Sequence, residues 1–244
     1  MWNRSELKSN AKLALKANYW KAVLVGLILS FILGSGSTAA QNSARSSTDG
    51  LTDIDPVMVF TVIGIILAAV FVAMVISILL SIFIWNPLEV GCQKFFINCK
   101  YGNAELGDMA YGFKNGYAHI GMIMFLRGLF TGLWMLLFII PGIVKSYEYM
   151  MIPYLLAEHP EMTRQEAFAE SKQMMDGNKW DAFVLDLSFI GWTLLGVCTF
   201  GILLVFYVEP YIYLTRAELY HALKNNNKSV SYTHLRAHET PEHL

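Results

Sequence analysis

The chain has 244 residues, of which 55% are hydrophobic and only 15% are charged, and its mean hydropathy is +0.43. Because about 25% of the residues in an ordinary soluble domain are charged, this composition predicts a protein that crosses a membrane several times. The formal net charge of -1 argues against nucleic acid as a partner, since a protein that binds a phosphate backbone needs a strongly basic face.

The first predicted element is an amphipathic helix over residues 3–17. Asn3 and Glu6 stand at the spacing of a capping box, which marks a helix start. One face of the helix carries three lysines at intervals of four residues: Lys8, Lys12 and Lys16. This pattern predicts a basic helix on the membrane surface.

Residues 19–33 form the first predicted span, and a polar loop rich in Gly, Ser, Thr and Asp follows over residues 34–55. A cleaved signal peptide is the alternative, because the small residues STAA follow the apolar stretch. The long amphipathic lead-in and the many later apolar segments favour a retained helix.

Residues 57–85 are almost uninterruptedly apolar and long enough to cross the ~30 Å hydrocarbon core with tilt. Asn86, Pro87 and Glu89 then follow the order of an N-cap, a first-turn proline and a capping glutamate. This order predicts that a separate surface helix begins there, over residues 87–99.

A span is predicted over residues 119–140, and a shorter one over residues 143–157, on either side of Pro141-Gly142. One half-inserted helix over residues 138–157 is the alternative to this hairpin of two crossings. Three glycines of the first arm share one face and predict close helix packing there: Gly121, Gly128 and Gly132.

Thr163 and Glu166 form another capping box, which opens a predicted surface helix over residues 164–176. Residues 181–196 and 197–214 predict a last hairpin of spans. The fold class expected is therefore all-α: a polytopic transmembrane bundle of about six spans with amphipathic surface helices, as one membrane domain over residues 1–228.

The distribution of basic residues along the chain agrees with a topology of six crossings in which the N-terminus lies on the inner side of the membrane. Only Arg45 falls in a predicted outer loop. The inner segments hold Arg4, Lys8, Lys12, Lys16, Lys21, Lys94, Lys100, Lys114, Arg164, Lys172, Lys179, Arg216, Lys224 and Lys228. This distribution obeys the positive-inside rule and predicts cytoplasmic termini, and Trp20, Trp85 and Trp180 fall at the predicted inner boundaries.

Several residues have the spacing of a known family. The pattern comprises PYLLAE at residues 153–158 and GNKW at residues 177–180, and its most informative positions are Pro153, Glu158, Ser171, Gly177, Trp180 and Asp186. In this pattern, over about residues 4–224, the chain resembles the bacterial integral-membrane family called domain of unknown function 975. The resemblance implies a multi-pass protein of the bacterial cytoplasmic membrane and brings no established activity. A looser similarity to the membrane domains of glycerophosphodiester phosphodiesterases hints at a lipid-facing role.

Residues 229–244 depart from this pattern and are predicted to be a disordered, non-native tail. The stretch SYTHLRAHETPEHL at residues 231–244 resembles a translated sequencing-adapter read-through. A metal-binding pair of His234 and His238 is the alternative, but no carboxylate or cysteine stands at ligand spacing.

Four charged residues fall within predicted spans, where an unpaired charge costs ~2.5–3.5 kcal/mol. For Arg127 and Glu148 we expect an internal ion pair between adjacent spans. For Lys145 and Asp186 we expect positions near the headgroups, Lys145 on the outer side and Asp186 on the inner side.

The sequence contains no catalytic or metal-binding constellation. Glu158-His159 lacks the second histidine of HExxH, and neither a GxSxG nor a glycine-rich phosphate loop is present. The three cysteines, Cys92, Cys99 and Cys198, form no CxxC pair. We therefore expect no enzyme, cofactor or metal, and a lipid bilayer with a lipid or membrane protein as partner. The function expected is organisation of membrane components, with a small-molecule or lipid transporter as the alternative and an intramembrane enzyme as a third, less favoured class.

Overall fold

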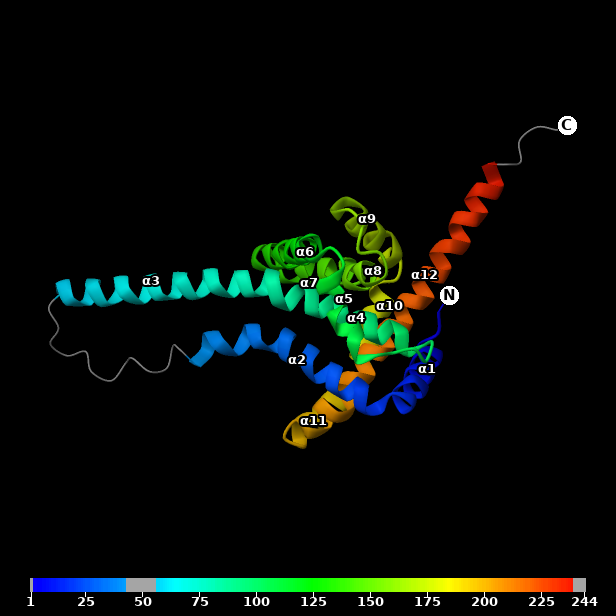
Figure 1. The fold of residues 1–244 in the computed structure, drawn as a ribbon, viewed down its shortest axis with the longest axis horizontal. Coiled ribbons are helices and arrows are strands. Elements are labelled where there is room, and N and C mark those ends of the chain that lie inside the picture. Colours follow the sequence, from blue (N-terminus) through cyan, green and yellow to red (C-terminus); the bar gives the residue numbers. More distant parts are fainter. Residues whose placement is uncertain (1, 43–55, 239–244) are drawn as a thin grey trace.

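The computed structural model describes residues 2–42 and 56–238, and along residues 31–42, 56–59 and 227–238 it describes the backbone alone. Every regular element in these ranges is helical, which confirms the predicted all-α class (Figure 1). The α-helices are α1 (Arg4–Ala17), α2 (Tyr19–Asn42), α3 (Pro56–Leu80), α4 (Asn86–Cys99), α5 (Tyr111–Lys114), α6 (Tyr117–Leu137), α7 (Ile139–Glu148), α8 (Ile152–Glu158), α9 (Arg164–Met175), α10 (Lys179–Leu187), α11 (Ile190–Cys198) and α12 (Glu209–His238). Two π-helical segments, η1 (Ser81–Trp85) and η3 (Leu204–Val208), and one 3-10 segment, η2 (Leu106–Ala110), complete the list.

The densely packed part of the molecule, which we call the head, is built from α1, α4, α8, α9 and the first half of α12 (Figure 1). α4 lies at its centre, and Phe95 and Phe96 of this helix are buried. The prediction of a surface helix over residues 87–99 is therefore wrong. α8 is equally enclosed, because every residue from Ile152 to Ala157 is buried in the head.

α3 and α4 are joined without a break, so the predicted helix start at Asn86 is also wrong. The helix runs on from Phe60 to Cys99, and Asn86 has helical backbone angles and donates its backbone N–H to the carbonyl of Ser81. A proline ring clashes with the carbonyl four residues earlier. For Pro87 that carbonyl belongs to the π-helical η1 segment, whose wider turn accommodates the proline within a continuous helix.

α6 and α7 form the first hairpin, which turns at Phe138. A Cβ atom on Gly142 would lie 2.7 Å from the Cα atom of Met135, so α7 approaches α6 at a distance that only glycine permits. The predicted break at Pro141-Gly142 is displaced, since both residues lie inside α7.

α10 and α11 run outward as one arm of the second hairpin, and residues 202–208 return as the other. The chain turns at Phe200 and Gly201, whose φ angles of 53° and 83° are left-handed. At Gly196 a Cβ atom would lie 2.4 Å from the Cγ atom of Leu204, which again shows a close approach of the two arms. The turn therefore comes a few residues later than the predicted boundary between residues 196 and 197.

Three helical stretches of the described chain are long and apolar enough to cross a membrane: Phe60–Cys99, Tyr117–Leu137 and Lys179–Cys198. The bent pair of α1 and α2, which meet at 108°, raises this number to four. Six spans are not confirmed. α7 has 10 residues, which is about 15 Å of helix, and the following α8 is buried inside the head.

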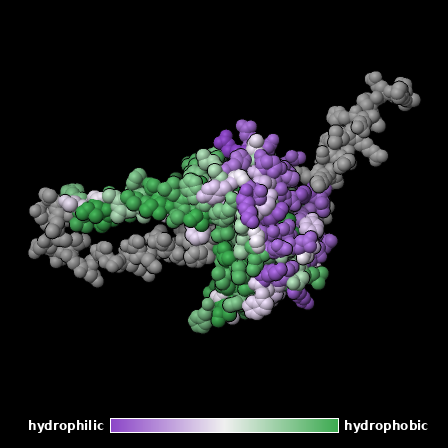
Figure 2. Space-filling view, in the orientation of Figure 1, coloured by the Kyte–Doolittle hydropathy of each residue, from purple (hydrophilic) through white to green (hydrophobic). Residues whose placement is uncertain are grey.

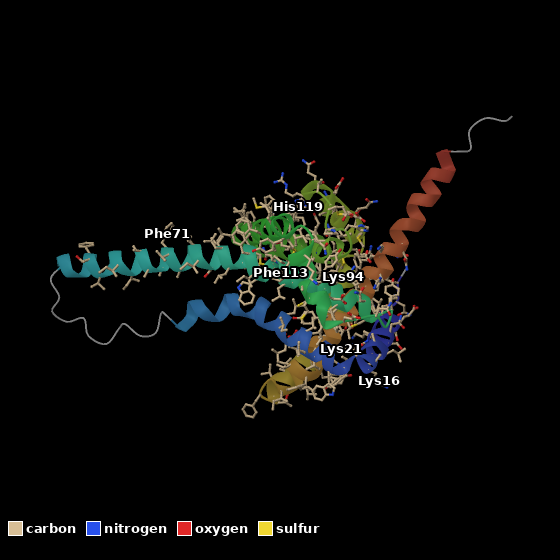
Figure 3. The ribbon with its side chains drawn as sticks, in the orientation of Figure 1. Lys16, Lys21, Phe71, Lys94, Phe113 and His119 are labelled. Atoms are coloured by element: carbon tan, nitrogen blue, oxygen red, sulfur yellow. The ribbon has the colours of Figure 1, made fainter. Side chains whose placement is uncertain are left out.

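Polar and apolar surfaces are segregated. Figure 2 shows hydrophilic residues over the head, and hydrophobic residues along α3 and on the parts that project from the head beside it. The side chains of α3 have few neighbours, and Phe71, halfway along this helix, is 61% exposed (Figure 3). These apolar helices are consistent with a membrane protein.

Two predicted surface helices are present, but α1 starts with Asn3 accepting a hydrogen bond from the N–H of Ser5 and not with the predicted capping box of Asn3 and Glu6. α1 buries Leu7, Ala11 and Leu15 against the head, and α9 begins with the predicted capping box of Thr163 and Glu166. The backbone of α12 continues to His238, and the disorder and non-native origin expected of residues 229–244 stay a prediction. No glycine or proline interrupts residues 211–238, so nothing local ends the helix. Residues 43–55, within the predicted outer loop, and residues 239–244 lie outside the described residues.

Candidate functional site: an ionic collar at the base of two hairpins

Three groups of ion pairs lie at the base of the two hairpins, where these leave the head. We call these three groups the collar. Its members are Glu89 with Arg127, Glu148 with Lys145 and Lys179, and Asp186 with Arg216.

The first pair fixes α6 to α4. Arg127 donates a hydrogen bond from Nη1 to Oε1 of Glu89 at 2.9 Å, and the Glu89 side chain is only 10% exposed. Nearby, the Asn86 amide donates to the carbonyl oxygen of Gly121 at 3.1 Å. The residues that were read as a helix start therefore act as cross-links between helices.

The second group is centred on Glu148, whose side chain is 5% exposed. Oε1 accepts from Lys145 Nζ at 2.8 Å, and Oε2 accepts from Lys179 Nζ at 2.9 Å. The hydroxyl of Ser171 donates to the backbone carbonyl of Glu148 at 2.7 Å. These bonds join α7 to α9 and α10, and they hold the first hairpin against the second.

The third pair fixes α10 to α12. Arg216 donates from Nη2 to Oδ2 of Asp186 at 3.1 Å and from Nε to Oδ1 at 3.3 Å. The hydroxyl of Tyr147 donates to the same carboxylate at 3.1 Å. Asp186 thereby connects both hairpins with the head.

These partners correct the predicted ion pair. Arg127 and Glu148 are each paired, but with Glu89 and with two lysines rather than with each other. For Lys145 and Asp186 the prediction of positions near the headgroups did not include their ion pairs, which join Lys145 to Glu148 and Asp186 to Arg216. Sequence reasoning missed Glu89, Lys179, Arg216 and Tyr147, because contacts between residues 30–40 positions apart leave no local signal.

Glu158 anchors α8 to α12 in the head. It accepts a hydrogen bond from the Tyr220 hydroxyl at 2.7 Å and is ion-paired with Lys224. Burial raises the pKa of Glu158, but the hydrogen bonds from Lys224 and Tyr220 outweigh burial and hold the pKa below its usual value. Its neighbour His159 points to Glu161, so the Glu158-His159 pair forms no catalytic dyad.

The other positions of the family-like motif have structural roles. Pro153 lies buried in the first turn of α8, and Gly177 has a φ of 71° just after α9, as predicted for a glycine that ends a helix. Trp180 is 71% exposed at the base of the second hairpin and packs on Phe183.

Only one of the three predicted packing glycines packs within the chain. A Cβ atom on Gly121 would lie 2.5 Å from the carbonyl oxygen of Ile82, whereas a Cβ atom on Gly128 or Gly132 would meet no neighbouring atom of the described chain within 4 Å. The prediction for the last two is therefore wrong within one chain, because they lie beyond the point at which α6 touches the head.

The lysine face of α1 lies beside the base of the second hairpin. Lys8 donates from Nζ to the Ser188 hydroxyl at 2.6 Å and lies over the Phe189 ring, and Lys12 lies over the Tyr211 ring. Burial, together with the charges of Lys12 and Arg4, lowers the pKa of Lys8. Lys16 is exposed, as is Trp20 in the next helix.

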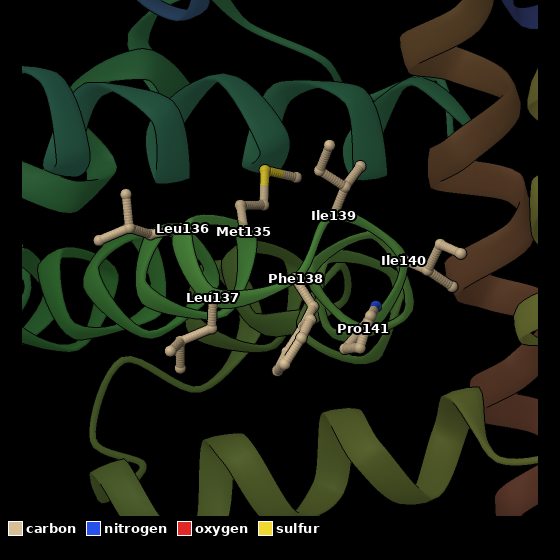
Figure 4. A pocket seen from close by; sticks show the side chains of 7 residues that line it. All are labelled: Met135, Leu136, Leu137, Phe138, Ile139, Ile140 and Pro141. Carbon is tan, nitrogen blue, oxygen red and sulfur yellow. The ribbon is translucent and has the colours of Figure 1, made fainter.

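Two hollows of the described chain are lined mainly by apolar side chains. A hollow of about 910 Å³ at the tip of the first hairpin is lined by apolar side chains from Met135 to Pro141 (Figure 4). A second, of about 400 Å³, lies between α7 and α10 beside Lys179 and Tyr147. Within the described residues, no three His, Cys, Asp or Glu side chains come together as metal ligands.

One part of the chain is similar to a family of known sequences. No curated protein and no solved structure matches the chain significantly. Residues 121–227 match the model of the family described as "Protein of unknown function (DUF975)". This segment contains both hairpins, α8, α9 and all six motif residues, whereas the resemblance expected over residues 4–120 is not matched. Over residues 121–227 the chain is therefore similar to the DUF975 family of proteins of unknown function.

Proposed function

We propose that this chain is a multi-pass protein of the bacterial cytoplasmic membrane that organises membrane or envelope components at the inner surface and is not an enzyme. One observation carries the proposal: the charged groups at the base of the apolar hairpins are paired with one another across helices. Such groups brace helices and leave no free acid, base or nucleophile in the collar.

The distribution of basic residues supports cytoplasmic termini. Arg45 is the only basic residue between Lys21 and Lys94 in the sequence, and Arg127, Lys145, Lys179 and Arg216 belong to the collar. Lys and Arg are in excess on the cytoplasmic side of membrane proteins. The head would therefore face the cytoplasm.

The face of α1 provides a contact with anionic lipid. Lys12 and Lys16 are exposed, and Trp20 beside them is 74% exposed. Near an anionic leaflet each basic residue contributes ~1 kcal/mol of attraction, and tryptophan favours the interface. These residues would hold the head against the headgroups.

α9 does not offer its methionines to a partner. Met174 and Met175 are 3% and 0% exposed and face the head. The outward face of α9 is polar and includes the exposed Arg164, Gln165 and Lys172. A membrane-protein partner at the cytoplasmic side would therefore meet a charged surface.

Native mass spectrometry of the detergent-extracted protein tests the lipid contact. We expect the wild-type chain to retain anionic phospholipid, and the Lys12→Gln/Lys16→Gln variant to retain less. A matched control is Lys114→Gln/Lys172→Gln, which removes the same charge from exposed positions on other elements. Equal retention by all three proteins would contradict the role given to α1.

A transporter of small molecules or lipids is the second candidate. The observation in its favour is the nearly buried carboxylate of Glu148 between two lysines. Buried, paired charges of this kind line substrate and ion routes in transporters. The collar pairs would then be part of a substrate route, and neutralising Glu148 would stop transport without unfolding the protein.

A further inference from the structure

The two hairpins differ from α3 in length. Residues 56–88 carry no charged side chain, and α3 alone has 25 residues, or about 38 Å of helix. In the first hairpin the charge-free segment lies between Arg127 and Lys145, so the arm from Arg127 to the end of α6 reaches about 15 Å. This length is about half of the ~30 Å hydrocarbon core.

The second hairpin has nearly the same reach. Its charge-free segment lies between Asp186 and Glu209, and the arm from Asp186 to the end of α11 at Cys198 is about 18 Å long. Figure 1 shows α3 extending far beyond both hairpins on the same side of the head. Neither hairpin is long enough to cross a bilayer from the collar.

The tips of the hairpins are apolar and exposed. Leu136 is 84% exposed and Ile140 is 77% exposed at the first tip, and Phe200 is 98% exposed at the second. Full burial of such a side chain is worth ~1.5–3 kcal/mol. A turn that emerged into water would forgo this energy at every one of these positions.

The backbone of the second tip satisfies its own hydrogen bonds. The N–H groups of Thr199, Phe200 and Gly201 donate to the carbonyls of Leu195, Val197 and Gly196. Those of Ile202 and Leu203 donate to the carbonyl and the hydroxyl of Thr199. Five consecutive N–H groups therefore need no water, which is the condition for placing a turn in hydrocarbon.

The collar marks the level of the headgroups. Lys179 and the exposed Trp180 stand side by side at the start of the second hairpin. Paired cations and tryptophan are typical of this zone.

We propose that both hairpins are re-entrant: they enter the bilayer from the side of the head, contact the acyl chains of that leaflet, and turn back near the bilayer centre. Only α2 and α3 then cross the membrane. The inference rests on the proposed membrane location and adds which leaflet the two hairpins occupy. A re-entrant hairpin returns the chain to the side from which it entered, as two full crossings would. Every basic segment therefore stays on the side expected for six crossings, and the positive-inside rule holds equally well.

Depth-dependent fluorescence quenching tests the proposal. The full chain, with its own tryptophans replaced by phenylalanine, would carry Phe200→Trp in vesicles of phosphatidylcholine brominated either near the headgroup or near the chain end. We expect the strongest loss of fluorescence with bromine near the chain end. Phe71→Trp, halfway along α3, is the matched control and should give the same pattern.

Cysteine labelling of intact cells provides a second readout that keeps the native tryptophans. Single cysteines, in a background without the native three, would replace Phe200 or, as the positive control, Ser46 in the predicted outer loop. We expect an impermeant maleimide to label Ser46→Cys and to leave Phe200→Cys at background.

Two outcomes would overturn the proposal, and a third would refute the membrane location on which it rests. Labelling of Phe200→Cys from outside would show that the hairpin crosses. Quenching of Phe200→Trp by bromine near the headgroup, without outside labelling, would show that the hairpin lies on the surface. Failure of both brominated lipids to quench Phe71→Trp would instead refute the membrane location itself, which separates the two claims.

Discussion

The guanidinium of Arg216 donates two hydrogen bonds to the carboxylate of Asp186, and this pair ties the second hairpin to α12. A bidentate pair of this kind has a defined geometry and is stronger than a single contact. Since Tyr147 of the first hairpin donates to the same carboxylate, Asp186 is the residue on which the placement of both hairpins depends.

Asp186→Asn should therefore destabilise the protein. Loss of the charge leaves the partly buried Arg216 without its counter-ion, and hydrogen bonds to charged groups are worth ~1.5–3 kcal/mol. The measurement is the melting temperature in detergent, with Asp181→Asn as the control in the same helix. A melting temperature as low for the control as for Asp186→Asn would contradict the assigned role.

A double-mutant cycle distinguishes the observed partner of Arg127 from the predicted one. Arg127→Met combined with Glu89→Gln should be milder than the sum of the two single changes, because removing one partner of a buried pair strands the other. Arg127→Met combined with Glu148→Gln should be additive. The reverse result would restore the pair that was predicted from sequence.

The difference between these pairs shows what the sequence can and cannot predict. The capping box of Thr163 and Glu166 and the left-handed Gly177 are local patterns, and both were predicted correctly. The order Asn86-Pro87 is equally local, but there the long-range bonds of Asn86 and Glu89 to α6 keep the helix continuous. Tertiary contacts overrode the local signal.

The apolar character of the two hairpins can be predicted from the sequence, but the short length of their charge-free arms cannot. Hydropathy predicts that a segment prefers lipid, whereas the positions of Arg127 and Asp186 at the base depend on contacts with other helices. The burial of α8 in the head was missed for the same reason, since a short buried helix and a short span have similar composition.

Acidification should destabilise the head through His221. Burial, together with the charge of Lys100, lowers the pKa of His221 below its ordinary value. A lowered folded pKa means that the unfolded chain binds the proton more readily, so stability falls as the pH drops through the unfolded pKa. His221→Gln should flatten the fall in melting temperature between about pH 7 and pH 5.5.

The control for this experiment is His159→Gln, whose side chain is 49% exposed and lies at the head surface. This change should leave the profile as it is in the wild type. At still lower pH both proteins should lose stability as Glu158 is protonated, because its folded pKa is depressed. An unchanged profile for His221→Gln would contradict the assignment.

The two kinds of glycine in the first hairpin should respond oppositely to alanine. Gly142→Ala places a Cβ atom against the backbone of Met135, and overpacking of this kind costs ~1–3 kcal/mol. Gly128→Ala meets open space and removes a helix-destabilising residue, a gain of ~0.5–1 kcal/mol. Destabilisation by Gly128→Ala in membranes would instead reveal a second chain packed on that face.

The central claim is that the chain organises the membrane without moving a substrate, and its most direct test is flux through liposomes that contain the purified protein. We expect the efflux of trapped ions and small solutes, and the transfer of labelled lipid between leaflets, to equal that of protein-free vesicles. Protein-dependent flux that Glu148→Gln abolishes, while Glu161→Gln at the exposed surface leaves it intact, would contradict the account and identify a transporter.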